Sequence, residues 1–292
     1  MVGMKFVFKI LFLIVSTGVM GQEFTAFRFF NKKGNTAKTT RMVKDLAQYD
    51  VILFGENHNN AMNHWLQLKL TQALYDIKKQ QLVLGAEMFE RDNQAGIDAY
   101  LNQRLEAKNL KDSVRLWTNY ETDYRPLLDF AKEKRLMFVA TNIPRRYASQ
   151  VSKQGLESLN ELPPKDKTYI ANLPITVTLE TPGYPEMKKM MGSHADDMKV
   201  FNFISAQAIK DATMAESILK VWQPGTLFLH YNGNYHSKEY GGIYWYLKKS
   251  KPDLKVAVIS VFESENPQVD LPKESILTEY NLVIPSDMTK TY

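Results

Sequence analysis

Four side chains that can exchange protons or bind metal ions stand at the ends of apolar segments. Glu56 is the last residue of one apolar run, and His58 lies two residues later. Glu87 lies near the end of a second run, and His236 follows a third. Carboxylates and imidazoles bind divalent metal ions with a position left open for water or substrate, and they also act as general acids and bases. We therefore expect a metal site or an acid–base site, the alternative being that each residue is a hydrogen-bonded structural group.

The segments that carry these residues predict the fold. Apolar runs typical of strands span Val51 to Glu56, Gln81 to Met88, Leu136 to Asn142, Thr226 to Tyr231 and Lys255 to Phe262. Helical spacing of apolar residues occurs at Asn63 to Lys78, Asn93 to Leu101 and Tyr124 to Lys134. This alternation predicts an α/β fold with a mostly parallel central sheet flanked by helices. Because open parallel sheets bind ligands at the carboxyl ends of their strands, we expect the four side chains on one rim.

A long interval separates the third predicted strand from the fourth. Residues 148–219 are expected to be mainly helical, interrupted by several prolines. No Gly/Ser linker brackets the interval and no internal repeat is visible. We interpret it as a helical insertion within a single domain that spans residues 22–292.

Composition excludes several classes of protein. The chain of 292 residues contains no cysteine, so disulfides, thiolate zinc sites and iron–sulfur clusters are excluded. A net charge of +5, dispersed along the chain, does not indicate a nucleic-acid partner. Walker, G-x-G-x-x-G, G-x-S-x-G and H-E-x-x-H motifs are also missing from the sequence.

The first 21 residues have the pattern of a secretory signal peptide. Lys5 and Lys9 precede a short apolar core, and small residues lead to a cleavage point after Gly21. The apolar core is too short to span a membrane, and Gln22 offers no lipobox cysteine for lipid attachment. We expect an exported protein, periplasmic or secreted, the alternative being that the leader stays as an interfacial anchor.

Five ordered motifs carry a family resemblance. They are Gly55-Glu56-Asn57-His58, Glu87-Met88-Phe89-Glu90-Arg91, Asn142-Ile143-Pro144-Arg145, Gln207 with Asp211-Ala212-Thr213-Met214-Ala215, and Gly233-Asn234-Tyr235-His236. Their order resembles the ChaN-like family of haem-binding uptake proteins in the Tiki superfamily. The resemblance implies an α/β fold, an extracytoplasmic location and haem or iron acquisition. The superfamily is also similar to Tiki-type metal-dependent proteases and erythromycin-esterase-like enzymes. A metal-dependent peptidase or esterase using the four rim residues is thus the alternative, and a degenerate member that only mediates protein contacts is a third reading.

Haem binding requires an apolar slot, an axial ligand and cations for the propionates. The methionine-rich stretch from Tyr184 to Met214 can form the walls of such a slot, although methionines at helical spacing also occur in ordinary cores. The resemblance implies a tyrosine ligand, for which Tyr184 and Tyr235 are the candidates. Candidate propionate partners are Lys188, Lys189, Arg145 and His194. A homodimer around haem and an outer-membrane haem receptor are the expected partners.

Three further positions have roles that the sequence leaves open. Gln207 and Asp211 lie four residues apart and so share one face of a predicted helix. Asp211 is expected to orient His58 or His236 through an imidazole N–H, unless it is a surface or capping carboxylate. His64 is expected to be a solvated or packing residue. Arg145 and Arg146 have the guanidinium geometry to clamp a carboxylate or phosphate, or else form surface charge.

Overall fold

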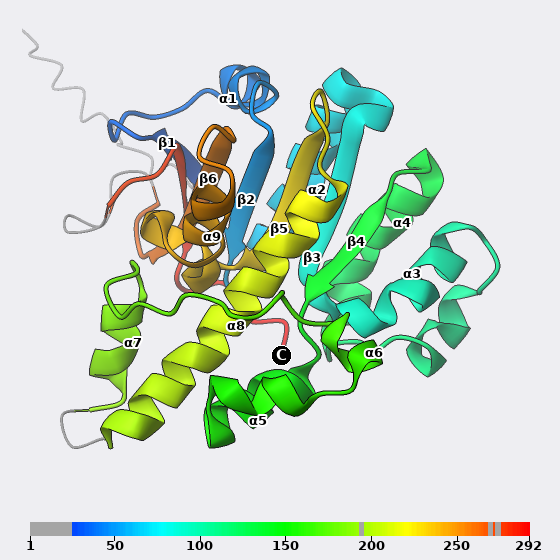
Figure 1. Ribbon diagram of the computed structural model, residues 1–292. Coiled ribbons are helices and arrows are strands. Elements are labelled where there is room, and N and C mark those ends of the chain that lie inside the picture. Colours follow the sequence, from blue (N-terminus) through cyan, green and yellow to red (C-terminus); the bar gives the residue numbers. More distant parts are fainter. Residues whose placement is uncertain (1–24, 193–195, 268–270, 272–275) are drawn as a thin grey trace, which may run out of the picture.

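A central sheet of seven strands organises the computed structural model, which describes residues 25–192, 196–267, 271 and 276–292. The strand order is β1-β7-β6-β2-β5-β3-β4 (Figure 1). All neighbouring pairs are parallel except β1 and β7, which are antiparallel. The predicted fold class, a mostly parallel sheet flanked by helices, is therefore confirmed. The strands are β1 (Arg28–Asn31), β2 (Val51–Glu56), β3 (Leu82–Glu90), β4 (Phe138–Asn142), β5 (Leu227–Gly233), β6 (Val256–Ser264) and β7 (Tyr280–Pro285).

Helices cover both faces of the sheet. Residues of α1 (Thr39–Leu46), α2 (Ala61–Lys78), α3 (Gln94–Leu101) and α4 (Arg125–Lys134) pack in one apolar cluster. Residues of α5 (Arg145–Gln154), α7 (Tyr184–Met190), α8 (Asp197–Val221) and α9 (Gly242–Ser250) pack in the other, and α6 (Pro164–Lys167) is a short turn beside α5. The result is a three-layered α/β/α arrangement with the sheet in the middle.

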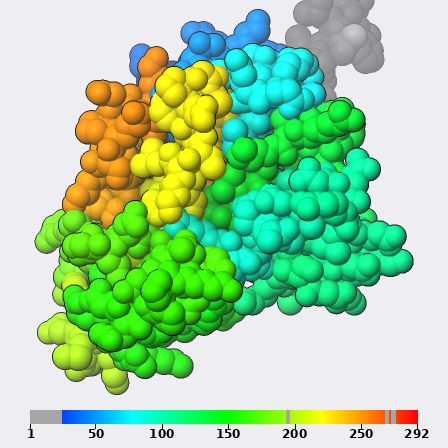
Figure 2. Space-filling view, turned by 45° about the vertical axis from the view of Figure 1, so that its right-hand side comes forward, coloured from blue at the N-terminus to red at the C-terminus, as the bar shows by residue number. Residues whose placement is uncertain are grey.

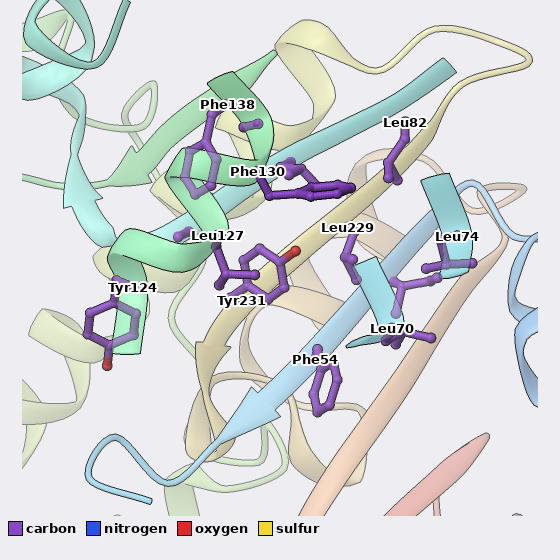
Figure 3. Packing of buried hydrophobic residues seen from close by; sticks show 14 of the residues in the cluster. Phe54, Leu70, Leu74, Leu82, Tyr124, Leu127, Phe130, Phe138, Leu229 and Tyr231 are labelled. Atoms are coloured by element: carbon purple, nitrogen blue, oxygen red, sulfur yellow. The ribbon is translucent and has the colours of Figure 1, made fainter. Parts of the chain in front are cut away.

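The central strands are apolar on both sides because each side meets helices. All six residues of β2 are buried, and successive side chains enter opposite clusters. Ile52 and Phe54 pack with Leu70 of α2, whereas Val51 and Leu53 pack on the α8 face. Figure 3 shows the first of these clusters, with Phe54, Leu70 and neighbouring apolar side chains filling the space between strand and helix. Such continuous apolar runs are typical of a parallel sheet with both faces covered.

The predicted strands and helices match the structure to within two residues at most ends. The prediction for β2 has the observed bounds, and the long interval between β4 and β5 contains α5 to α8, as expected of a helical insertion. The sequence interpretation missed β1, β7, α1 and α9. β1 has four residues, and β7 contains Asn281 and ends at Pro285, so neither shows a long apolar run.

The structure does not test the expectation of export. The predicted signal peptide, residues 1–21, lies outside the described residues. Among the residues that are described, none of the helices has both the length and the apolar character needed to cross a bilayer.

Candidate functional site

The loop after β2 is ordered by its own asparagines. The side chain of Asn60 accepts hydrogen bonds from the backbone N–H groups of Met62 and Asn63 and so caps the start of α2. The Oδ1 atom of Asn63 in turn accepts a hydrogen bond from the backbone N–H of Asn57, at 3.1 Å. Held at both ends in this way, the loop fixes the position of His58 at the carboxyl edge of the sheet.

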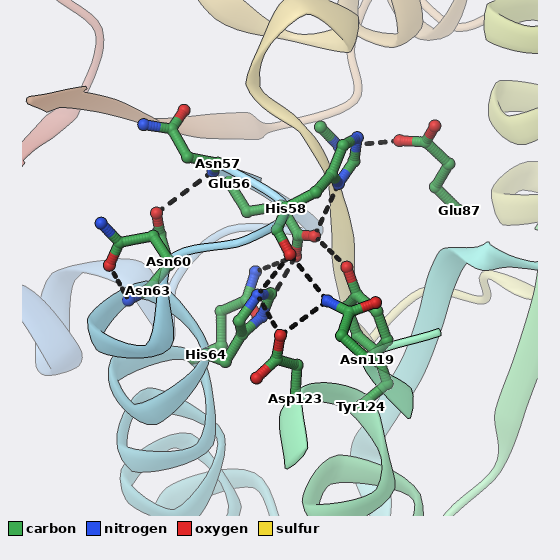
Figure 4. A network of polar contacts seen from close by, with 12 residues as sticks. Glu56, Asn57, His58, Asn60, Asn63, His64, Glu87, Asn119, Asp123 and Tyr124 are labelled. Atoms are coloured by element: carbon green, nitrogen blue, oxygen red, sulfur yellow. Dashed lines mark hydrogen bonds and ion pairs between the residues drawn. The ribbon is translucent and has the colours of Figure 1, made fainter. Parts of the chain in front are cut away.

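Glu56 and His58 form the first pair of the site (Figure 4). Glu56 is buried, and its Oε1 atom lies 2.9 Å from Nδ1 of His58. The same Oε1 accepts a hydrogen bond from the hydroxyl of Tyr124 at 2.8 Å, and Oε2 accepts one from the side-chain amide of Gln67 at 2.7 Å. Both oxygens of the buried carboxylate therefore have hydrogen-bond partners. A buried charge requires such partners because it has lost its contacts with water.

The two members of this pair favour each other's charged forms. Burial by itself raises the pKa of Glu56, but the nearby imidazoles and the hydrogen bond from Gln67 lower it below its ordinary value. Burial likewise lowers the pKa of His58, but the hydrogen bond to Glu56 and the charge of Glu87 raise it above its ordinary value. The His58 side chain is 34% exposed, so it is the member of the pair that solvent can reach.

Further polar side chains contact the backbone of His58 and hold it in place. His64 is buried, with Nε2 3.1 Å from the backbone oxygen of His58 and 3.4 Å from Oδ2 of Asp123. The amide of Asn119 donates to the same backbone oxygen at 2.7 Å and to Asp123 at 2.6 Å. Of the two roles expected for His64, solvated or packing, the structure shows a buried ring with polar partners, because α2 turns the ring toward the end of β2.

Glu87 and His236 form the second pair. Oε1 of Glu87 lies 3.1 Å from Nε2 of His236, and Oε2 of Glu87 accepts a hydrogen bond from the backbone N–H of Gly233 at 2.7 Å. The other imidazole nitrogen, Nδ1, lies 2.5 Å from Oδ1 of Asp211 on α8. The amide nitrogen of Gln207, one helical turn before Asp211, lies 2.9 Å from that Nδ1. His236 is therefore enclosed between two carboxylates.

This enclosure keeps His236 charged. Burial lowers the pKa of an imidazole, but Glu87 and then Asp211 outweigh it and raise the pKa of His236 to about 10. The same ion pair holds the pKa of Glu87 well below its ordinary range, although burial alone would raise it. A third imidazole behaves in the opposite way: His230, inside β5, has no carboxylate within hydrogen-bond distance, and burial lowers its pKa to about 4.

Gly233 lies beside a residue of each pair. A methyl group at this position would lie 2.8 Å from the ring of His58 and 3.4 Å from Oε2 of Glu87. The strand order explains the meeting, since β5 lies between β2 and β3 and its end is flanked by the ends of both. The four residues expected on one rim are thus neighbours in the structure.

The four rim residues form two imidazole–carboxylate pairs, each of which can hold a proton. Each imidazole faces a carboxylate directly, and among the described residues no group of three or more His, Asp or Glu side chains is placed to hold a metal ion. The expectation of a divalent-metal site at Glu56, His58, Glu87 and His236 therefore gains no support, and neither does the metal-dependent hydrolase. The arrangement can hold or move a proton at the accessible His58.

The other predicted residues differ in burial and in the partners that they contact. Tyr184 is buried, and its hydroxyl donates a hydrogen bond to Oδ2 of Asp211 at 2.8 Å, so it belongs with the His236 group. Tyr235 is 47% exposed, Lys188 is exposed on α7, and Arg145 is exposed at the first residue of α5. Arg146 forms an ion pair with Asp92 at 2.6 Å. His194 lies outside the described residues.

Sequence reasoning missed the residues that partner Glu56 and His58. Gln67 and His64 are polar residues three positions apart on the buried face of α2, and that departure from an apolar helix face is a signal that was available. Tyr124, Asn119 and Asp123 come from a π-helical turn before α4 and its flank. No motif marks that turn.

An apolar hollow lies between residues of the insertion and Tyr235, the residue before His236. Its volume is about 300 Å³, and we call it the methionine patch, lined by Met187, Met190, Met191, Phe203 and Tyr235. Met190 is 74% exposed and Phe203 is 41% exposed, which is unusual for such side chains. Figure 2 shows the green and lime segments of the insertion projecting at the lower left of the molecule. The hollow therefore combines an apolar wall with access from solvent.

One solved structure shares the fold of this chain. A solved structure described as cofacial haem binding to ChaN of Campylobacter jejuni shares 18% identity, with a TM-score of 0.67, over 90% of this chain and 98% of that one. The effector domain RRSP of a Vibrio vulnificus toxin gives a TM-score of 0.45 at 16% identity, over 84% of this chain and 39% of that one. An Arabidopsis thaliana protein, RETICULATA-RELATED 5, chloroplastic, is 28% identical over 82 residues, which is 28% of this chain and 11% of that protein.

A family model gives the more specific result. The model described as haem-binding uptake, Tiki superfamily, ChaN matches residues 42–247, well over half of the chain and all of the elements from α2 to the end of α8. With the strand-end motifs and the three-layered sheet on the same residues, the chain belongs to the ChaN family of haem-binding uptake proteins in the Tiki superfamily.

Proposed function

We propose that this protein binds haem at the methionine patch and serves iron acquisition outside the cytoplasm. The observation that carries the proposal is the solvent-accessible apolar hollow of about 300 Å³ between α7 and α8. A porphyrin is a flat apolar group, and exposed methionines adapt their shape to such a surface. The family to which the chain belongs supports haem as the ligand.

Tyr235 is the residue that we assign as axial ligand. It lines the hollow and is 47% exposed, whereas the other candidate, Tyr184, is 2% exposed and donates its hydroxyl hydrogen to Asp211. Haem iron accepts a tyrosine oxygen as ligand. The bound iron supplies the coordination chemistry, and this chain supplies the apolar wall and the oxygen donor.

Cations for the propionates are available beside the hollow. Lys188 and Lys189 are exposed on α7, and among the described residues neither forms an ion pair. Their ammonium groups are suited to a carboxylate at the edge of the porphyrin. Arg145 and His194, the other two candidates from the sequence, are not needed for this assignment.

A second copy of the chain completes the proposed site. Met190, Met198 and Phe201 are 74%, 72% and 45% exposed, so α7 and the start of α8 present further apolar side chains to solvent. An exposed apolar surface of this kind favours association, and the related protein of Campylobacter jejuni is described with cofacial haem. We propose a homodimer around haem, with an outer-membrane haem receptor as the partner in transfer.

Export is part of the same proposal. The signal peptide predicted at residues 1–21 would leave a mature chain that begins at Gln22, without a lipid anchor. The intact mass of protein recovered from the periplasm or medium measures this directly. A full-length product confined to the cytoplasm would contradict it.

The deciding experiment is a haemin titration of the mature protein followed in the Soret region. We expect a saturable Soret shift at micromolar haemin, weakened at least tenfold by Met190→Glu combined with Phe203→Glu. Ile77→Glu is the matched control, because Ile77 is 48% exposed on α2 and lines none of the patch. No saturable shift, or an equal loss in the control, would overturn the proposal.

A further inference from the structure

The residues that follow β7 cross the carboxyl edge of the sheet. Figure 1 shows this red segment running beneath the strand ends to the position marked C. Lys290 forms an antiparallel bridge with Asn60, and the backbone N–H of Thr291 donates to the backbone oxygen of Asn59 at 2.9 Å. We call residues 290–292 the strap. It lies against the loop that carries His58 as a short extended strand would.

Side chains fasten the strap on both sides of that loop. Nζ of Lys290 lies 2.6 Å from Oε1 of Glu263, at the end of β6. The hydroxyl of Thr291 donates to Oδ2 of Asp123 at 2.7 Å. The third side chain, that of Tyr292, is 61% exposed. A cation and a hydroxyl are therefore each bound by an acidic residue.

The receiving residues also hold His58. Asp123 accepts hydrogen bonds from both Thr291 and Asn119, and Asn119 donates to the backbone oxygen of His58. The strap contacts Asn59, the next residue after His58. Displacing the strap would therefore loosen the loop and the Asp123–Asn119 contacts that hold His58 in place.

We propose that the strap is an intramolecular peptide ligand of the strand-end crevice, and that its release opens a site for an extended peptide with a basic and a hydroxyl side chain. Backbone pairing with the Asn59–Asn60 edge supplies the binding mode, as in other proteins that add a strand to an exposed edge. Asp123 and Glu263 supply the preference for such side chains. The site is distinct from the methionine patch.

The attachment is weak enough to be reversible. It consists of a backbone bridge, which includes the Thr291–Asn59 hydrogen bond, one hydroxyl hydrogen bond, and an ion pair whose side chains are 37% and 30% exposed. Exposed ion pairs and single hydrogen bonds contribute little net free energy. Segments with few buried apolar contacts open at low cost, so a competing peptide can displace the strap.

The first experiment measures the accessibility of His58 in the full mature chain. Thr291→Pro removes both the N–H and the hydroxyl donor, whereas Thr291→Ser keeps both and is the matched control. We expect diethylpyrocarbonate to modify His58 at least threefold faster in Thr291→Pro than in the control. His230, which is fully buried in β5, is the internal reference for intact folding and should react slowly in both variants.

The second experiment tests peptide binding. A fluorescent peptide with the sequence of residues 288–292 is added to a chain that lacks those residues and to the full chain. We expect saturable binding to the shortened chain only, weakened at least fivefold by Asp123→Asn. An unchanged His58 rate in Thr291→Pro, or no saturable binding to the shortened chain, would overturn the inference.

Discussion

Nδ1 of His236 lies 2.5 Å from Oδ1 of Asp211, although the two residues are 25 positions apart and belong to different layers. With Glu87 on the other nitrogen, the imidazole is held between two carboxylates in a buried position. Such an arrangement fixes the orientation and the charge of the ring together. The raised pKa of His236 therefore favours the charged form of the ring at neutral pH.

Asp211→Asn should lower the pKa of His236. The substitution keeps the size of the side chain and removes one of the two charges that raise this pKa to about 10. We expect a fall of at least about one unit in an NMR titration of the ring, with one unit corresponding to about 1.4 kcal/mol. Asp92→Asn, which alters a carboxylate paired with Arg146, is the control and should leave the titration of His236 in place.

Acid should destabilise the protein partly through His230. Its pKa is about 4 in the folded chain and ordinary in the unfolded chain, so unfolding takes up a proton between these values. Stability is therefore complete above about pH 6.5 and is lost as the pH falls toward 4, by about 3 kcal/mol from this group. Urea unfolding across this range should show a shallower pH dependence in His230→Gln. An identical slope in both proteins would contradict the assignment.

Gly233→Ala should separate His58 from Glu56. The new methyl group would lie 2.8 Å from the His58 ring, while the backbone of Gly233 (φ −53°) is one that alanine adopts readily. We expect the ring to move and the pKa of His58 to fall toward its ordinary value. Combining the substitution with His58→Ala should restore part of the lost stability, because the clash is then absent. Additive losses in this double-mutant cycle would speak against a direct contact.

Tyr124→Phe should destabilise the fold by about 1–3 kcal/mol, because it leaves the buried Oε1 of Glu56 with one partner fewer. Chemical denaturation measures the change. Tyr75→Phe is the matched control, since the hydroxyl of Tyr75 makes no hydrogen bond to any other described residue. Equal effects of the two substitutions would show that the hydroxyl contact with Glu56 contributes little.

Tyr235→Phe should weaken haem binding at least tenfold and alter the absorption spectrum of the complex, because it removes the proposed oxygen ligand. Tyr184→Phe provides the comparison: its hydroxyl is bound to Asp211, so haem affinity should change little. The haemin titration described above measures both. The reverse order of effects would exchange the roles of the two tyrosines.

Local sequence patterns were sufficient to predict the layers of the fold and much of the rim site. Apolar runs of strand length alternating with helical spacing predicted β2 to β6 and the helices α2, α3 and α4, because both periods are set by the backbone. The same patterns placed Glu56, His58, Glu87 and His236 at strand ends, where the topology of a parallel sheet gathers side chains. The family resemblance carried by the ordered motifs is matched by the family model.

Pairings between distant segments could be determined only from the tertiary structure. Four contacts of this kind each join residues from separate elements. They are His236 with Asp211, Tyr184 with Asp211, Tyr124 with Glu56, and the strap with Asn59. These contacts depend on β5 lying between β2 and β3 and on the angle at which α8 crosses the sheet. The sequence by itself determined the elements and the chemistry at their ends, because these follow from local backbone periodicity. The tertiary structure decided the partners, because packing across the sheet sets those distances.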